Sequence, residues 1–239
     1  MQKVVEANKS TAVIWYLTGA VIVAGDLTGR VLELPLLDYI FKPLIMVWII
    51  LFTVKHWTVE KATVYKLLLG AFVFSWLGDV LLMFTDKGEH FFTAGLAAFL
   101  VAQCAYVITF WNAGGSFTKS SLLSRQPWWI GIFILYGVGL YWLLLPSLGV
   151  VLKVAVPLYE ISILGMAVMA LNRLGKVSSS SFSYTFSGAL LFMLSDSCIA
   201  VSRFIEPFPY ASLVIMVTYM AAQFLIMKGI IGYKKEGQY

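Results

Sequence analysis

Long runs of apolar residues, each followed by a short polar break, repeat along the whole chain. A transmembrane helix needs about 20 mostly apolar residues to cross the hydrocarbon core of a bilayer. Eight runs qualify, and they predict helices at residues 11–25, 36–54, 63–84, 90–111, 127–145, 149–171, 182–204 and 209–231. The breaks are too short for a separate domain, so we expect an all-α, polytopic membrane protein with a single eight-helix transmembrane domain across residues 1–239.

Composition agrees with this class, and the distribution of basic residues predicts the orientation. The 239 residues are 60% hydrophobic and only 12% charged, about half the charged fraction of a soluble domain. The net charge of +5 does not come from a basic stripe, so nucleic acid is not an expected partner. One side of the predicted membrane carries five of the 17 basic residues, and the other side carries the remaining 12: the five are Arg30, Lys42, Lys87, Lys153 and Arg203. The positive-inside rule therefore predicts a multi-pass cell-membrane protein with both termini in the cytoplasm.

Polar side chains inside the apolar runs are the candidates for chemistry. Asp79 lies in "FVFSWLGDVLLMF" and Asp196 lies in "GALLFMLSDSCIAV". A central Asp or Lys costs about 2.5–3.5 kcal/mol on insertion scales, so such residues usually face a polar cavity or a partner. Their depths predict that polar groups of several helices meet in one cavity in the middle to outer part of the bilayer: Lys42, Asp79, Gln103, Glu160, Asp196, Tyr219 and Gln223.

Structural roles are alternatives for the charged members of this set. The long side chain of Lys42 can extend to the outer interface instead of facing a cavity. Glu160 can be the structural partner of Lys42 or of Arg203. Either aspartate can be a buried, hydrogen-bonded strut.

A metal or other cofactor is not expected. The two histidines, His56 and His90, lie in predicted loops, and neither has a second ligand at the spacing of a metal site. A hard cation held by carboxylate oxygens is the one metal alternative, and its candidate ligands are Asp79, Glu160 and Asp196.

The two halves of the chain resemble each other weakly. "KPLIM" corresponds to "VPLYE", with Pro43 and Pro157 in matching places, and "GAFVFSWLGD" corresponds to "GALLFMLSD". "VAQCAY" and "AAQFLI" match in the fourth helix of each half. Because each half holds an even number of helices, the repeat is of the parallel type, with a pseudo-twofold axis along the membrane normal. Such an axis places Asp79 and Asp196 across from each other.

The motifs also resemble a known family. "FSWLGDVLLMF", "GALLFMLSDSCIAVSRF" and "YASLVIMVTYMAAQFLIMKG", with "FKPLIM" upstream, are similar to the YhhN-type membrane family, whose animal members are lysoplasmalogenases. The resemblance runs from the second predicted helix to the last. It implies an eight-helix hydrolase whose substrate is a lysophospholipid, the alkenyl-glycerophospho-ethanolamine or -choline called a lysoplasmalogen. The products are a fatty aldehyde and a glycerophospho-alcohol.

Two buried carboxyls suit this chemistry. Hydrolysis of a vinyl ether begins with proton transfer to carbon and proceeds through an oxocarbenium ion to which water adds. Glycosidases handle a similar cation with one protonated acid and one ionised carboxylate. We therefore expect Asp79 and Asp196 to be the acid and base, in an order that stays open. The residues expected to bind substrate or water are Lys42, Gln103, Glu160, Tyr219 and Gln223.

A protein without turnover is the alternative from a different class. Parallel repeats and charges near the midplane are also typical of small transporters and lipid-binding membrane proteins. Release of aldehyde distinguishes the two classes, because a carrier only binds or moves its ligand. The sequence does not predict the oligomeric state.

Overall fold

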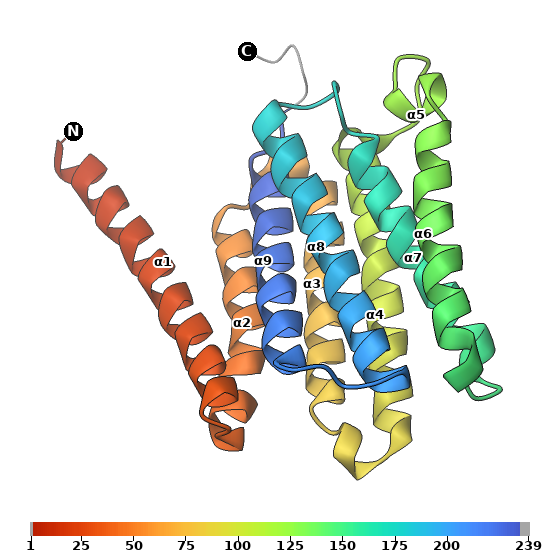
Figure 1. Ribbon diagram of the computed structural model, residues 1–239. Coiled ribbons are helices and arrows are strands. Elements are labelled where there is room, and N and C mark those ends of the chain that lie inside the picture. Colours follow the sequence, from red (N-terminus) through yellow and green to blue (C-terminus); the bar gives the residue numbers. More distant parts are fainter. Residues whose placement is uncertain (1, 235–239) are drawn as a thin grey trace.

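The computed structural model describes residues 2–234, with side chains from residue 12 on, and every regular element in this range is a helix. Eight of the helices are long and apolar enough to cross a membrane, and they form one bundle (Figure 1). They are α1 (Gln2–Val31), α2 (Pro35–Lys55), α3 (Ala62–Leu82), α4 (Glu89–Phe110), α6 (Trp128–Leu144), α7 (Leu152–Leu171), α8 (Ser179–Phe204) and α9 (Ala211–Ile231). A short helix, α5 (Leu122–Arg125), lies in the loop between α4 and α6. The predicted all-α class with eight spans is confirmed.

The predicted helix boundaries agree with the observed ones except in α1. This helix was predicted over residues 11–25, but it begins at Gln2 and continues to Val31. The polar residues after position 25 stay helical because Asp26 and Arg30, one turn apart, form an ion pair of 2.9 Å between Oδ2 and Nε. Arg30 also pairs with Asp38, with 2.7 Å between Nη2 and Oδ1, which ties the end of α1 to the start of α2.

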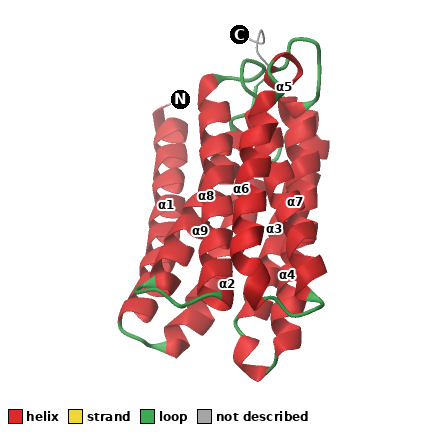
Figure 2. Ribbon diagram, turned by 45° about the vertical axis from the view of Figure 1, so that its right-hand side comes forward, coloured by secondary structure: helices red, strands yellow, loops and turns green. Residues whose placement is uncertain are grey.

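Two helix pairs pack especially closely, and glycines make this possible. A Cβ added at Gly78 of α3 would lie 2.6 Å from the ring of Phe99 on α4. A Cβ at Gly188 of α8 would lie 2.8 Å from the carbonyl oxygen of Ala222 on α9. The pairs α3–α4 and α8–α9 therefore form the closely packed centre of the bundle, and α1 and α6 lie at its two sides in the view of Figure 1. Figure 2 shows the loops that join the helices at both ends of the bundle.

The arrangement of neighbours follows the order expected for two similar halves. α2 packs on α3, α3 on α4, and α4 on α7; the counterparts are α7 on α8, α8 on α9, and α9 on α2. A parallel repeat requires these matched pairs, and the repeat itself stays a prediction. α1 begins and α9 ends at the same end of the bundle (Figure 1), and the side that faces the cytoplasm also stays a prediction.

Proline lies inside both α2 and α7, at Pro43 and Pro157. Proline cannot donate a backbone hydrogen bond, so it leaves the carbonyl four residues earlier without its helical partner. For Pro157 that carbonyl belongs to Lys153, and it accepts a hydrogen bond of 3.0 Å from the hydroxyl of Tyr141 on α6. This bond fixes one end of α6 against α7.

Candidate active site

Asp196, on α8, is held by hydrogen bonds from two other helices. Its Oδ2 accepts a bond of 3.1 Å from Nε2 of Gln103 on α4 and a second bond from the hydroxyl of Tyr159 on α7. Gln103 is itself held in place, because its Oε1 accepts a hydrogen bond from Ser162 of α7. Hydrogen bonds to a carboxylate are strongest when it is ionised, so this arrangement suits Asp196 as an anion.

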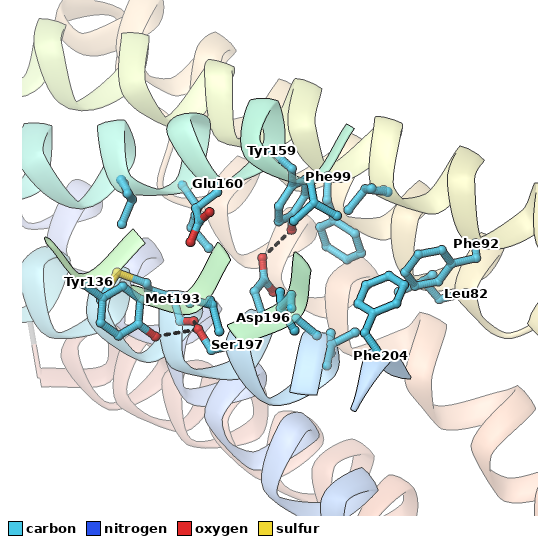
Figure 3. A pocket seen from close by; sticks show the side chains of 18 residues that line it. Leu82, Phe92, Phe99, Tyr136, Tyr159, Glu160, Met193, Asp196, Ser197 and Phe204 are labelled. Atoms are coloured by element: carbon cyan, nitrogen blue, oxygen red, sulfur yellow. Dashed lines mark hydrogen bonds between the residues drawn. The ribbon is translucent and has the colours of Figure 1, made fainter. Parts of the chain in front are cut away.

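An apolar cavity opens beside Asp196, between α4, α6, α7 and α8 (Figure 3). Its volume is about 70 Å³, which is room for a few water molecules rather than for a whole lipid chain. Aromatic and aliphatic side chains form most of the wall, and a few polar groups interrupt it: Tyr136, Tyr159, Glu160, Asp196 and Ser197.

Glu160 is the second carboxyl in this cavity. It lies on α7 next to Tyr159, is 8% exposed, and its Oε1 has no hydrogen-bond partner among the described residues. It lies beside Gly137 of α6, where an added Cβ would be in ordinary contact with the carboxyl group at 3.5 Å. The pairing of Glu160 with Lys42 or Arg203 is wrong, because the ion pairs of the described side chains all involve Arg30. The free oxygen of Glu160 is available to a ligand in the cavity.

Asp79, on α3, lies behind the wall of the cavity. It is 4% exposed, and its Oδ2 accepts a hydrogen bond of 2.7 Å from the hydroxyl of Tyr219 on α9. The ring of Phe99 packs edge-on against Tyr219, with centroids 6.0 Å apart, and also lines the cavity. Phe99 therefore lies between the cavity and Tyr219, the residue that bonds to Asp79.

A second buried hydrogen-bond network continues from Asp79 towards the opposite end of the bundle. The hydroxyl of Tyr106 on α4 donates to Oε1 of Gln223 on α9 at 2.5 Å and lies 3.5 Å from Oγ of Ser75 on α3. All three residues are fully buried. This network joins α3, α4 and α9.

Lys42 occupies a different cavity, where α1 ends and α2 begins. This second cavity has a volume of about 310 Å³ and is mostly polar. Leu82 of α3 lines both cavities and so forms the wall between them. Lys42 and Asp79 lie close enough to interact electrostatically, although they make no direct ion pair.

The predicted common cavity is therefore wrong, and the candidate residues divide into three neighbouring groups. Asp196 and Glu160 line the apolar cavity with Gln103 bonded to Asp196, Lys42 lines the polar one, and the buried networks between helices hold Asp79, Tyr219 and Gln223. Residue position determines depth in the membrane, but the large side chains of Phe99 and Leu82 decide which space a polar group reaches.

Sequence reasoning missed several participants. Tyr159 and Ser162 support Asp196 and Gln103, and Tyr106 supports Gln223. Tyrosine and serine are common in membrane helices, so their presence in an apolar run gives little signal. The signal that was available is spacing along one helix face, since Tyr106 follows Gln103 by three residues and Ser162 follows Tyr159 by three.

No metal centre is formed by the described side chains, since no group of three His, Cys, Asp or Glu residues lies close enough together to hold an ion. His56 follows the last residue of α2, as expected for a loop residue. His90 was also predicted in a loop but lies in the first turn of α4. Its ring packs on Phe91, with centroids 4.4 Å apart.

Comparison with known proteins identifies the family. The model of the YhhN family matches residues 37–230. The chain belongs to the YhhN family. This match covers most of the chain and includes every candidate site residue, so the resemblance seen in the motifs is confirmed.

Curated relatives carry a common name. Lysoplasmalogenase TMEM86B of Homo sapiens is 35% identical over 173 residues, which cover 71% of this chain and 66% of that protein. Lysoplasmalogenase TMEM86A of Bos taurus is 34% identical over 158 residues, which cover 64% of this chain and 60% of that protein. The alignments thus span less than two thirds of the length of these relatives. No solved structure matches this chain.

Proposed function

We propose that this YhhN family member is a membrane-embedded hydrolase that cleaves the vinyl ether bond of lysoplasmalogens. The products are a fatty aldehyde and a glycerophospho-ethanolamine or -choline. The names of the curated relatives support the reaction class. The observation that carries the proposal is Asp196, held by Gln103 and Tyr159 at the edge of an apolar cavity that contains a second carboxyl.

The reaction needs a proton donor and an anion. A protonated carboxyl transfers its proton to the alkene carbon beyond the ether-bearing one, and the positive charge is shared between the other alkene carbon and the ether oxygen. Asp196 faces this cation as the ionised carboxylate and accepts a proton from the attacking water. The hemiacetal then collapses, which breaks the bond between carbon and ether oxygen. The glycerol oxygen takes the proton that Asp196 received from water, and the hemiacetal hydroxyl gives its proton to the carboxylate of the donor, so both carboxyls regain their starting states as the aldehyde leaves.

Two carboxyls are candidates for the proton donor. The sequence pattern favours Asp79, which completes the pair with Asp196 and is bonded to Tyr219. A specific observation favours Glu160, because it lines the same cavity as Asp196 and has an oxygen without a partner. The remaining polar groups hold the carboxylates and position water, and Gln103 is the clearest of these since it bonds directly to Asp196.

The alkenyl chain has a path along α6. A third cavity, of about 230 Å³, lies between α6, α7 and α8, and Tyr136 and Met193 line both it and the cavity beside Asp196. The two spaces follow each other along the helix, and both are mostly apolar. A chain that starts at the vinyl ether beside Asp196 would pass these two side chains and continue into the third cavity.

Aldehyde release by the purified protein tests the proposal. Asp196→Asn is expected to lower the rate by about 10²–10⁴-fold, the usual contribution of acid–base catalysis. Comparing Asp79→Asn with Glu160→Gln identifies the proton donor. Only the variant that removes the donor should lower the rate by as much as Asp196→Asn does. Lipid binding or movement without aldehyde from the wild-type protein would instead identify a carrier and overturn the hydrolase proposal.

A further inference from the structure

The polar cavity at the junction of α1 and α2 carries charges of both signs in a defined order. Arg30, Asp38 and Lys42 line it, and Asp26 lies behind Arg30. Arg30 is fixed by ion pairs to both aspartates and by a hydrogen bond of 2.6 Å from Nη1 to Oγ of Ser212 on α9. The guanidinium thus holds three helices around the cavity.

Lys42 differs from Arg30 because no side chain neutralises it directly. The described residues offer it neither a hydrogen bond nor an ion pair, although it lies seven residues into a membrane helix. That position is about 10 Å from the start of the helix. An ammonium group at such depth is costly unless it faces a polar space or an anion. The cavity is that space, and it is open to an anionic ligand.

Asp38 and Lys42 lie on the same face of α2, because residues four apart are neighbours on a helix. Asp38 is one turn nearer to the end of the helix, and 35% of its side chain is exposed. For a lipid whose chain lies deeper in the bundle, the cavity therefore offers an ammonium group first and a carboxylate nearer to the end of the helix. A phospho-amine has the complementary order, with its amine at the tip and its phosphate nearer to the glycerol.

The geometry points to this cavity as the headgroup site for a lysophospholipid with a phospho-amine headgroup, with Lys42 on the phosphate and Asp38 on the amine. This inference rests on the proposed function, because the glycerol would pass Leu82, the wall shared with the cavity beside Asp196. Arg30 is a positioning residue, because its ion pair with Asp38 orients that carboxylate.

Binding of an ether lipid that cannot be hydrolysed tests the site separately from catalysis. The probe is hexadecyl-glycerophosphoethanolamine with a saturated ether, compared with hexadecylglycerol and with hexadecylglycerol phosphate. The wild-type protein should bind the phosphoethanolamine lipid most tightly. Lys42→Gln should weaken this binding by about 10–100-fold, as expected for the loss of a charge-assisted contact, and should leave binding of hexadecylglycerol unchanged. Asp38→Asn should remove only the preference for the amine.

Matched variants keep the test decisive. Lys87→Gln is the control, since Lys87 lies at the same end of the bundle but is exposed and packs on Phe84 outside the cavity. Lys42→Arg should retain most of the binding because it keeps the charge. The headgroup site would be overturned if Lys42→Gln bound the phosphoethanolamine lipid as tightly as the wild-type protein does. It would also be overturned if the wild-type protein bound all three lipids equally well. Equal binding of glycerophosphoethanolamine without a chain would overturn the assignment to a lipid.

This binding experiment and the aldehyde-release assay together separate this inference from the proposed hydrolase. A protein that discriminates headgroups but releases no aldehyde retains the site and loses the proposed function. A protein that releases aldehyde at equal rates from lipids with and without the phosphate retains the function and loses the site.

Discussion

Replacing Tyr159 by Phe removes a single hydroxyl from the candidate site. That hydroxyl and Nε2 of Gln103 are the two donors to Oδ2 of Asp196, so the variant leaves the carboxylate with one of them. A hydrogen bond to a charged group contributes about 1.5–3 kcal/mol. If the bond supports the ionised carboxylate in the transition state, its loss corresponds to a fall in kcat of roughly 10–100-fold.

The assay is aldehyde release from lysoplasmenyl-ethanolamine by the purified variant, with kcat and KM determined separately. Tyr159 acts through Asp196 as a positioning residue, so kcat should fall while KM changes little. Tyr136→Phe is the matched control, because Tyr136 lines the same cavity and its hydroxyl lies 2.5 Å from Oγ of Ser197, which is not a carboxylate. It should show no comparable loss of kcat.

Two results would refute this reasoning. The first is wild-type kcat for Tyr159→Phe, which would mean that the hydrogen bond to Asp196 does not support the reaction. The second is an equal fall in both variants, which would indicate a general disturbance of the cavity. Thermal unfolding of each variant in detergent shows whether the bundle remains folded.

Three further predictions concern packing, a buried cation and orientation. Gly188→Ala should lower the free energy of unfolding by about 1–3 kcal/mol, since the new methyl group would overpack the contact with α9. Gly139→Ala is the control and should not lower it, because no atom lies within 4 Å of a Cβ at that position. Unfolding in detergent measures both variants, and equal stability of the two would contradict the packing argument. Arg173→Met should lower the free energy of unfolding by about 2–5 kcal/mol. The guanidinium is fully buried and donates to two backbone carbonyls and a hydroxyl, which would lose their partner. An unchanged melting temperature would exclude this role. In a chain without its two native cysteines, a cysteine at Ser120 should resist a membrane-impermeant maleimide in intact cells while one at Glu206 reacts, and the opposite pattern would reverse the predicted orientation.

The length and position of the membrane helices were predictable because crossing a bilayer depends on hydrophobic length alone. α1 shows where that rule is insufficient. Asp26 and Arg30 look like a polar break in sequence, but as an ion pair one turn apart they remain helical and join α1 to α2. Hydropathy treats each charge separately and therefore does not detect such a pair.

The chemical content of the site was also largely visible in sequence. Carboxyl and amide side chains inside apolar runs are costly, so Asp196, Glu160 and Gln103 were recognisable as residues with a specific purpose. Tyr159 was not, since an aromatic residue with a hydroxyl fits a membrane helix with or without a polar partner. Its bond to Asp196 is visible only in three dimensions.

The sequence by itself thus determined the helices, the depth of each polar group, and membership of the YhhN family. Only the tertiary structure decided which polar groups share a space. Depth follows from counting residues along a helix, but contact depends on how each helix is rotated and on the volume of its neighbours. Phe99 and Leu82 fill the space between helices, and they divide one expected cavity into a polar site at Lys42 and an apolar site at Asp196.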